Sequence, residues 1–229
     1  FHDMVLADAR TLESERGKLA IMDIGCGGGF HSDAGLQESI ARVAGRYVGV
    51  EPDTEIELGK IFDATHRCRF EDAPIEPGSI DLAFAVMVLE HLENPGEFWD
   101  KVHRSLSPGG VFWAFTVDAR HWFVAASKLT EKLGVKDLYL DLLHGKRGEE
   151  RYENYGTHYQ TNTPAQIAGL VTAFSTCTVL NFRQVGQLDY YFPKPLRWTG
   201  RLVVEIADPV GLDPRFVHAG PPARASCPA

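Results

Sequence analysis

Residues 19–32 read LAIMDIGCGGGFHS and decide the fold, because an apolar run leads there directly into four glycines within five positions. A short apolar run in front of such a cluster is typical of a buried parallel strand that ends in a tight turn. Glycine permits positive φ angles and lets a ligand approach the backbone without meeting a Cβ, and a following helix presents N–H groups to it. The stretch therefore predicts a strand, a turn and a helix around a nucleotide-like ligand.

Strands and helices alternate beyond this turn as far as residue 117. Apolar segments within 45–53, 79–91 and 111–117 predict further strands, and 79–91 is apolar enough for a central one. Helical spacing at 53–62 and at 96–110, the latter closed by a Pro-Gly-Gly sequence, predicts helices between the strands. Alternation of this kind builds βαβ units and predicts a doubly wound, mostly parallel α/β sheet.

The second half of the chain breaks this alternation. Residues 118–160 combine an aromatic amphipathic stretch with a charged run, and a connection of that length predicts an inserted helical or loop cap over the substrate. Helical spacing returns at 161–174, where Thr163 is the expected N-cap, and 176–186 is the next expected strand.

Residues 187–229 are of uncertain structure. They allow a helix, and their end, 219–229, has the composition of a poorly ordered tail. No linker composition divides the chain, so we expect 1–229 to form a single domain with 19–117 as its ligand-binding core.

The composition is that of an ordinary globular protein, 44% hydrophobic and 24% charged. A net charge of −8 argues against general attraction to nucleic acid or to an anionic membrane. The four cysteines are spaced singly, which argues for reduced thiols and against a zinc site or a disulfide framework. Neither an apolar window of about 18 residues nor a signal peptide is seen. We therefore expect a cytoplasmic protein without a membrane span.

The spacing of the glycines separates three classes of nucleotide site. A dinucleotide fingerprint, G-x-G-x-x-G, fails because its last position is Phe30 or Ser32, depending on which glycine starts it. A P-loop fails because Gly29 is followed by Phe30 and His31 instead of a lysine. What remains, an acid two residues ahead of G-x-G-x-G at 23–29, resembles the first motif of the class I S-adenosylmethionine-dependent methyltransferases. An acid suits their ligand, which carries an ammonium and a sulfonium group.

That resemblance implies a Rossmann-like sheet of the seven-stranded type, S-adenosylmethionine as the cofactor and S-adenosylhomocysteine as its product. Further segments resemble the later motifs of the family in the same order, at 48–53, 68–85, 86–95 and 105–116. In the family, the acid after the second strand accepts both ribose hydroxyls, a role that falls here to Glu51. The residues implied to hold the cofactor are Asp23, Gly25, Gly27, Gly29, Glu51, Phe70, Glu71, Asp72 and Val88.

Phe70, Glu71 and Asp72 are the residues implied to lie near the adenine ring. Many relatives carry an aspartate where this chain has Cys68 and Arg69. The contact to the adenine amine is therefore left to Glu71 or Asp72.

A hydroxyl acceptor has to be oriented and has to lose its proton, and histidine is the usual base. Three histidines are candidates: His91 after the central strand, His121 after the strand at 111–117, and His158 ahead of the helix at 161–174. Each has a plainer alternative. His91 could only fix its loop or stack on the cofactor, His121 could belong to the core of the cap, and His158 could be solvated or cap the helix.

The sequence also bears on metals and on the acceptor. In metal-dependent methyltransferases of quinone precursors, a similar stretch carries a glutamate three positions ahead of the Glu-His pair, and here that position is Met87, so we predict no metal. The N/D-P-P-[YFW] motif of many nucleic-acid amino-methyltransferases is absent, which argues against a nucleic-acid substrate. Residues 119–123 and 157–174 resemble bacterial methyltransferases encoded among surface-glycan or natural-product genes.

We therefore expect a methyltransferase that acts on a small-molecule or glycan-like acceptor, with oxygen favoured and nitrogen or carbon left open. Two alternatives remain. One is an enzyme of the same fold that uses S-adenosylmethionine for another reaction, and the other is a non-catalytic homologue with a blocked acceptor pocket. The sequence makes no prediction of the oligomeric state.

Overall fold

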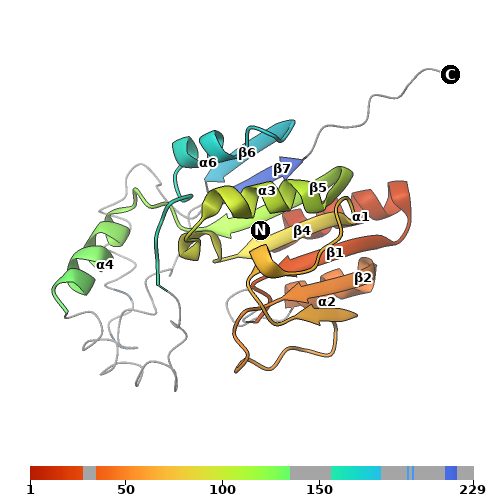
Figure 1. Ribbon diagram of the computed structural model, residues 1–229, viewed down its shortest axis with the longest axis horizontal. Coiled ribbons are helices and arrows are strands. Elements are labelled where there is room, and N and C mark those ends of the chain that lie inside the picture. The colour runs from red at the N-terminus through yellow and green to blue at the C-terminus, as the bar shows by residue number, and fades with distance from the viewer. Residues whose placement is uncertain (28–34, 135–155, 182–194, 196–197, 199–214, 221–229) are drawn as a thin grey trace.

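The computed structural model describes residues 1–27, 35–134, 156–181, 195, 198 and 215–220. Their strands form one seven-stranded sheet in the order β3-β2-β1-β4-β5-β7-β6 (Figure 1). The strands are β1 (Leu19–Ile24), β2 (Ala44–Val50), β3 (Ala64–His66), β4 (Ile80–Val86), β5 (Leu106–Thr116), β6 (Thr176–Asn181) and β7 (Arg215–Gly220). β1 to β5 pair in parallel, whereas β7 runs antiparallel between β5 and β6. The doubly wound, mostly parallel α/β sheet predicted from the sequence is confirmed.

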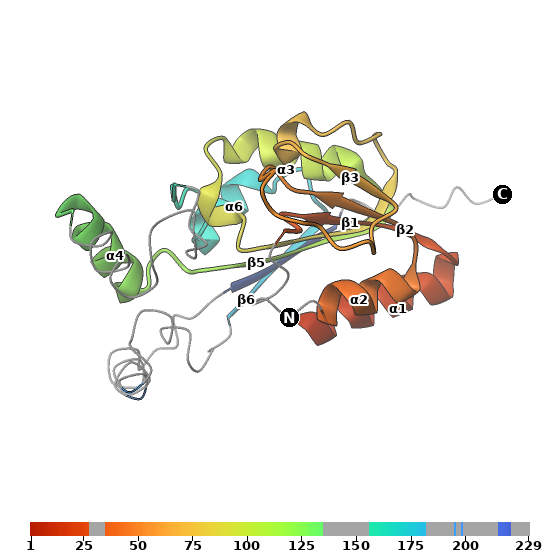
Figure 2. The same cartoon turned by 90° about the horizontal axis from the view of Figure 1, so that it is seen from below.

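Helices cover both faces of the sheet. They are α1 (His2–Arg16), α2 (Gly35–Val43), α3 (Pro95–Ser105), α4 (Trp122–Lys132) and α6 (Pro164–Leu170), with short 3₁₀ helices η1 (Phe70–Asp72) and η2 (Leu89–His91). Figure 2 shows α1 and α2 on one face and α3 and α6 on the other. α4 follows β5 and lies on the side of the sheet where the parallel strands end (Figure 1).

Alternate side chains of each central strand pack against opposite helix layers, because successive residues of a strand point to opposite faces. In β1, Leu19 and Ile21 belong to the apolar cluster that includes residues of α1 and α2, and Met22 and Ile24 belong to the cluster that includes residues of α3 and α6. The same alternation places the buried Asp23 on the α2 face of the sheet.

Trp99 of α3 lies at the centre of several aromatic contacts in the apolar cluster that includes residues of α3 and α6. Its ring meets Phe98, Phe112 and Phe174 edge to face, with centroid distances of 5.9, 5.4 and 5.9 Å. Its indole Nε1 donates to Thr161 Oγ1 at 3.0 Å. This buried bond ties α3 to the segment that precedes α6.

Several boundaries refine the expectations from the sequence. α3 ends at Ser105, ahead of the Pro-Gly-Gly sequence, because β5 already begins at Leu106. α6 begins after Thr163 as expected, and a capping box joins Thr163 and Gln166. α6 ends at Leu170 although Phe174 is still buried.

The prediction of a helix at 53–62 is wrong, because the structure has no helix in these residues. Asp53 Oδ1 accepts from the backbone N–H of Glu55 at 2.9 Å. Arg67 donates to the carbonyl oxygens of Asp53 and Ile56 at 2.8 and 2.7 Å. These bonds satisfy backbone groups that a helix would otherwise pair, and so they stabilise a loop.

α1 and β7 are absent from the sequence expectations. α1 buries Val5, Ala9 and Leu12, which are spaced as one face of a helix. β7 pairs with β5 and β6 along its whole length, so distant pairing rather than a local pattern defines it. It includes Ala219 and Gly220, for which the expected disordered tail is wrong.

Other expectations remain predictions. Residues 135–155, 182–194 and 221–229 lie outside the described residues, and with them the middle part of the proposed cap, the end of the strand expected at 176–186 and the rest of the tail. The single domain also stays a prediction. Within the described ranges, no helix has both the length and the apolar character needed to cross a membrane.

Candidate functional site

The glycine turn lies where β1 ends, next to the ends of β2 and β4. The backbone N–H groups of Gly25 and Cys26 donate to Val50 O at 2.8 and 3.3 Å, which ties the turn to β2. Gly25 has φ +75°, and a Cβ on it would lie 2.5 Å from Val88 Cγ2. Two of the predicted cofactor residues, Gly25 and Val88, are thus in contact. Gly29 lies outside the described residues.

Glu51 is held against the same turn. Its side chain is buried, its Oε2 accepts from Gly27 N at 2.8 Å, and its Oε1 accepts from Asp53 N at 3.0 Å. A Cβ on Gly27 would lie only 2.7 Å from Oε2, so glycine is required for this approach. Burial raises the pKa of Glu51, and the two backbone hydrogen bonds oppose that rise.

Asp23 is directed into the protein on the α2 face. Its Oδ2 accepts from Gln37 Nε2 at 2.8 Å and from the Tyr47 hydroxyl at 3.2 Å. Burial raises the pKa of Asp23 to about 7, and the hydrogen bonds from Gln37 and Tyr47 only partly offset that rise. Its predicted contact with a cofactor cation stays a prediction.

The three residues predicted near adenine differ in their surroundings. Phe70 is buried in the core, edge to face with Phe98 at 5.3 Å, and Lys101 Nζ lies 5.2 Å from its ring centroid. Glu71 Oε1 is buried and has no hydrogen-bond partner within the described part of the chain, whereas Asp72 is exposed. A buried oxygen without a partner calls for a donor, which favours Glu71 over Asp72 as the residue that meets the adenine amine.

A second cluster lies where β4 ends. His158 N and Tyr159 N both donate to Glu90 O, at 2.7 and 3.2 Å, and His91 Nδ1 lies 2.9 Å from Gly156 O. The structure thus joins η2 to the segment before α6 and brings His91 near the backbone of His158. A carbonyl oxygen only accepts, so Nδ1 carries the proton and Nε2 is the basic nitrogen of neutral His91.

Beneath His91 lies a buried polar chain that the sequence analysis missed. Thr116 Oγ1 donates to Glu90 Oε2 at 2.8 Å, and Asn162 Nδ2 donates to Thr116 Oγ1 at 2.6 Å and to Val117 O at 3.2 Å. Burial raises the pKa of Glu90, and attraction to His91 opposes that rise. The chain links η2, β5 and the segment before α6. In the sequence, only the Glu90-His91 pair pointed to this group of buried polar side chains.

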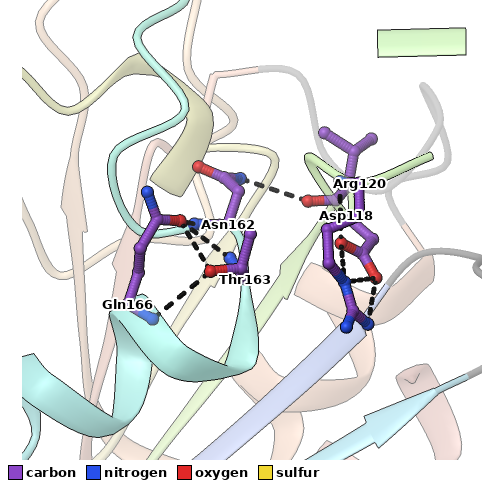
Figure 3. A network of polar contacts seen from close by, with 6 residues as sticks. Asp118, Arg120, Asn162, Thr163 and Gln166 are labelled. Atoms are coloured by element: carbon purple, nitrogen blue, oxygen red, sulfur yellow. Dashed lines mark hydrogen bonds and ion pairs between the residues drawn. The ribbon is translucent and has the colours of Figure 1, made fainter. Parts of the chain in front are cut away.

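Asn162 is followed directly by the capping box of α6. Figure 3 shows Asn162 beside Thr163 and Gln166, with Asp118 and Arg120 across from them. Asp118 is buried and accepts from Arg120 at 3.0 Å. The backbone N–H of His121 donates to Asp118 O at 3.0 Å, and the His121 side chain is buried at the start of α4. His158, by contrast, has an exposed side chain.

The sequence analysis also missed Gln37 and Tyr47, the donors to Asp23. The signal in the sequence was a glutamine on the apolar face of α2, beside Leu36 and Ile40. Among the described residues, no three of His, Cys, Asp and Glu are grouped so that they could hold a metal ion. The absence of a metal stays a prediction.

Comparison with known sequences gives a family match and a set of relatives. Residues 22–114 match a family model described as "Methyltransferase domain". The ubiquinone biosynthesis O-methyltransferase of Methylobacterium sp. (strain 4-46) is 27% identical over 191 residues, 79% of this chain and 67% of the relative. The protein of the same name from Nitrobacter winogradskyi is 32% identical over 123 residues, 50% of this chain and 44% of the relative. The chain thus matches between 44% and 67% of the length of these relatives.

Solved structures share the fold at low identity. A methyltransferase from Thermotoga maritima, described as a possible histamine N-methyltransferase, has a TM-score of 0.56 and 15% identity, over 96% of this chain and 90% of that one. Geranyl diphosphate C-methyltransferase from Streptomyces coelicolor A3(2) has a TM-score of 0.54 and 14% identity, over 94% and 77%. Together with the O-methyltransferases, these names cover three kinds of acceptor atom. The shared fold therefore does not fix the acceptor.

Gly27→Ala tests the link between the turn and Glu51. The new methyl group would lie 2.7 Å from Glu51 Oε2, so the carboxylate has to move. We expect the affinity for S-adenosylhomocysteine, measured by titration calorimetry, to fall by about tenfold or more, because a hydrogen bond to a charged group is lost. Gly59→Ala is the control, since its nearest contact would be 3.6 Å away. Unchanged affinity in Gly27→Ala would contradict the assignment of the turn to the cofactor.

The raised pKa of Asp23 predicts a pH-dependent stability. In the folded protein Asp23 keeps its proton up to about pH 7, whereas in the unfolded chain it loses the proton near pH 3.8. Between these values the folded state binds more protons, so the free energy of unfolding falls as pH rises, by up to about 1.4 kcal/mol per pH unit. Urea unfolding across this range should show a shallower fall in Asp23→Asn than in the wild type. Equal slopes in the two proteins would contradict the raised pKa of this carboxyl group.

Proposed function

We propose that this chain, which carries a class I S-adenosylmethionine-dependent methyltransferase domain, transfers the methyl group of S-adenosylmethionine to an oxygen atom of a small-molecule acceptor. The observation that carries the proposal is the glycine turn held against the buried Glu51 within the matched residues. Oxygen is supported by the names of the curated relatives. A cytoplasmic location belongs to the same proposal.

The residues of the turn fit the adenosyl part of this cofactor. Gly25 and Gly27 present backbone without a Cβ, as a close ligand requires, and Val88, which follows β4, contacts Gly25. Glu51 offers two carboxylate oxygens, which suits the neighbouring hydroxyls of a ribose. Glu71 offers a buried acceptor oxygen for the adenine amine. When bound, the cofactor supplies a methyl group on a positively charged sulfur.

On the acceptor side, we assign the base to His91. With its Nδ1 proton donated to Gly156 O, its Nε2 is the nitrogen that takes the proton from an acceptor hydroxyl. His121 and His158 remain the alternatives. The exposed His158 side chain is less suited than the half-buried His91 to hold a fixed position.

Apolar and aromatic side chains occur on the two segments that meet at His91. Met87, at the end of β4, has φ 55° and is 42% exposed, and Lys128 of α4 lies 4.7 Å from the centroid of the Tyr159 ring. A left-handed conformation at a non-glycine residue costs energy and often occurs at functional sites. An acceptor with an apolar or aromatic body and one hydroxyl fits these side chains. A glycan-like acceptor is the alternative, supported by the resemblance of residues 119–123 and 157–174.

The test is product analysis by mass spectrometry with phenolic, sugar and amine acceptors. We expect a gain of one methylene group on a hydroxyl acceptor. His91→Gln should lower kcat roughly a hundredfold or more, because the base is lost, and leave the affinity for S-adenosylhomocysteine unchanged. His158→Gln, at one of the alternative bases, should retain activity, and a loss there with an active His91→Gln would assign the base to His158. Methylation of amines alone would contradict the assignment of oxygen, and consumption of the cofactor without a methylated product would favour the alternative reaction class.

A further inference from the structure

Gln37 connects the α2 helix to the glycine turn. It lies in the first turn of α2, and its side chain is buried. Its single amide nitrogen, Nε2, donates to Asp23 Oδ2 at 2.8 Å and to Cys26 O at 2.7 Å. An amide nitrogen has two protons to donate, so both are used.

Asp23 in turn is fixed by a second donor. The Tyr47 hydroxyl of β2 lies 3.2 Å from Asp23 Oδ2, the same oxygen that Gln37 binds. All three side chains are buried. A buried polar group that loses its partner costs free energy, so this arrangement resists rotation of the Gln37 amide away from Cys26.

The bond to Cys26 O acts on Gly27 through one peptide plane. In a trans peptide the carbonyl oxygen of Cys26 and the N–H of Gly27 point in opposite directions. When Gln37 holds the oxygen towards α2, the N–H points away from α2. There it donates to Glu51 Oε2 at 2.8 Å.

We propose that Gln37 is a positioning residue of the cofactor site, which sets the Glu51 carboxylate for the ribose by orienting the Cys26–Gly27 peptide. Asp23 and Tyr47 serve this arrangement by holding the Gln37 amide. The inference rests on the role proposed above for Glu51. In this proposal Asp23, the acidic residue of the first motif, acts inside the protein by holding Gln37 and affects the ligand only indirectly.

A double-mutant cycle with S-adenosylhomocysteine as the ligand tests the inference. The variants are Gln37→Met, which keeps the size and removes the donor, Glu51→Gln, and the two combined. Titration calorimetry should give an affinity about tenfold lower for Gln37→Met alone. In the Glu51→Gln background the same change should have almost no further effect, because coupled residues are not additive. A residue with a merely structural role would weaken binding equally in both backgrounds.

Controls separate this result from general damage. Leu36→Met, the neighbouring buried residue on α2, should leave the affinity unchanged, and thermal unfolding without ligand reports the folding of each variant. If Gln37→Met is too unstable, Gln37→Leu, which also lacks the amide donor and brings no second carboxyl group against Asp23, takes its place in the cycle.

Two results would overturn the inference. One is an equal loss of affinity from Gln37→Met with and without Glu51, and the other is no loss in the wild-type background. Unchanged affinity in Glu51→Gln alone would instead refute the ribose role of Glu51. The methyl-transfer reaction itself is judged separately, by its product.

Discussion

The hydrogen bond from Gly27 N to the buried Glu51 carboxylate is the interaction on which the proposed cofactor site depends. It exists because a glycine leaves room for the carboxylate, and because the turn is fixed from both sides. Val50 O binds the turn from β2, and Gln37 binds it from α2. A buried carboxylate without such donors would be costly, and the N–H group of Gly27 supplies one of the two donors that Glu51 needs.

The proposed acceptor site, after the neighbouring strand β4, is also fixed by hydrogen bonds to buried groups. β4 ends in η2, and the carbonyl oxygen of Glu90 pairs with the segment before α6 while its carboxyl group is buried against Thr116. This segment is also tied to α3 through Thr161 and Trp99. Because ligands of parallel α/β sheets bind beyond the carboxyl ends of the strands, both clusters lie where a cofactor and an acceptor can meet.

The sequence predicted the fold well where patterns are local and strong. The run into the glycine turn and the apolar segments of β4 and β5 need no distant partner to be recognised. The prediction from the sequence failed at 53–62, where Arg67 donates hydrogen bonds to carbonyl oxygens of the loop. It also failed at β7, which is defined by pairing with two distant strands. Glu51 and His91 were selected by motif and their roles stay predictions. The inward direction of Asp23 follows from strand alternation and from Gln37, a residue that no motif marks.

The most direct test of the account is titration calorimetry of the unmodified chain with S-adenosylmethionine, S-adenosylhomocysteine and NAD in parallel. The account predicts binding of both adenosyl ligands with dissociation constants on the order of micromolar, and no binding of NAD. Binding of NAD alone would contradict the interpretation of the glycine turn. Binding of none of the three would contradict the claim that this edge of the sheet holds an adenosyl cofactor.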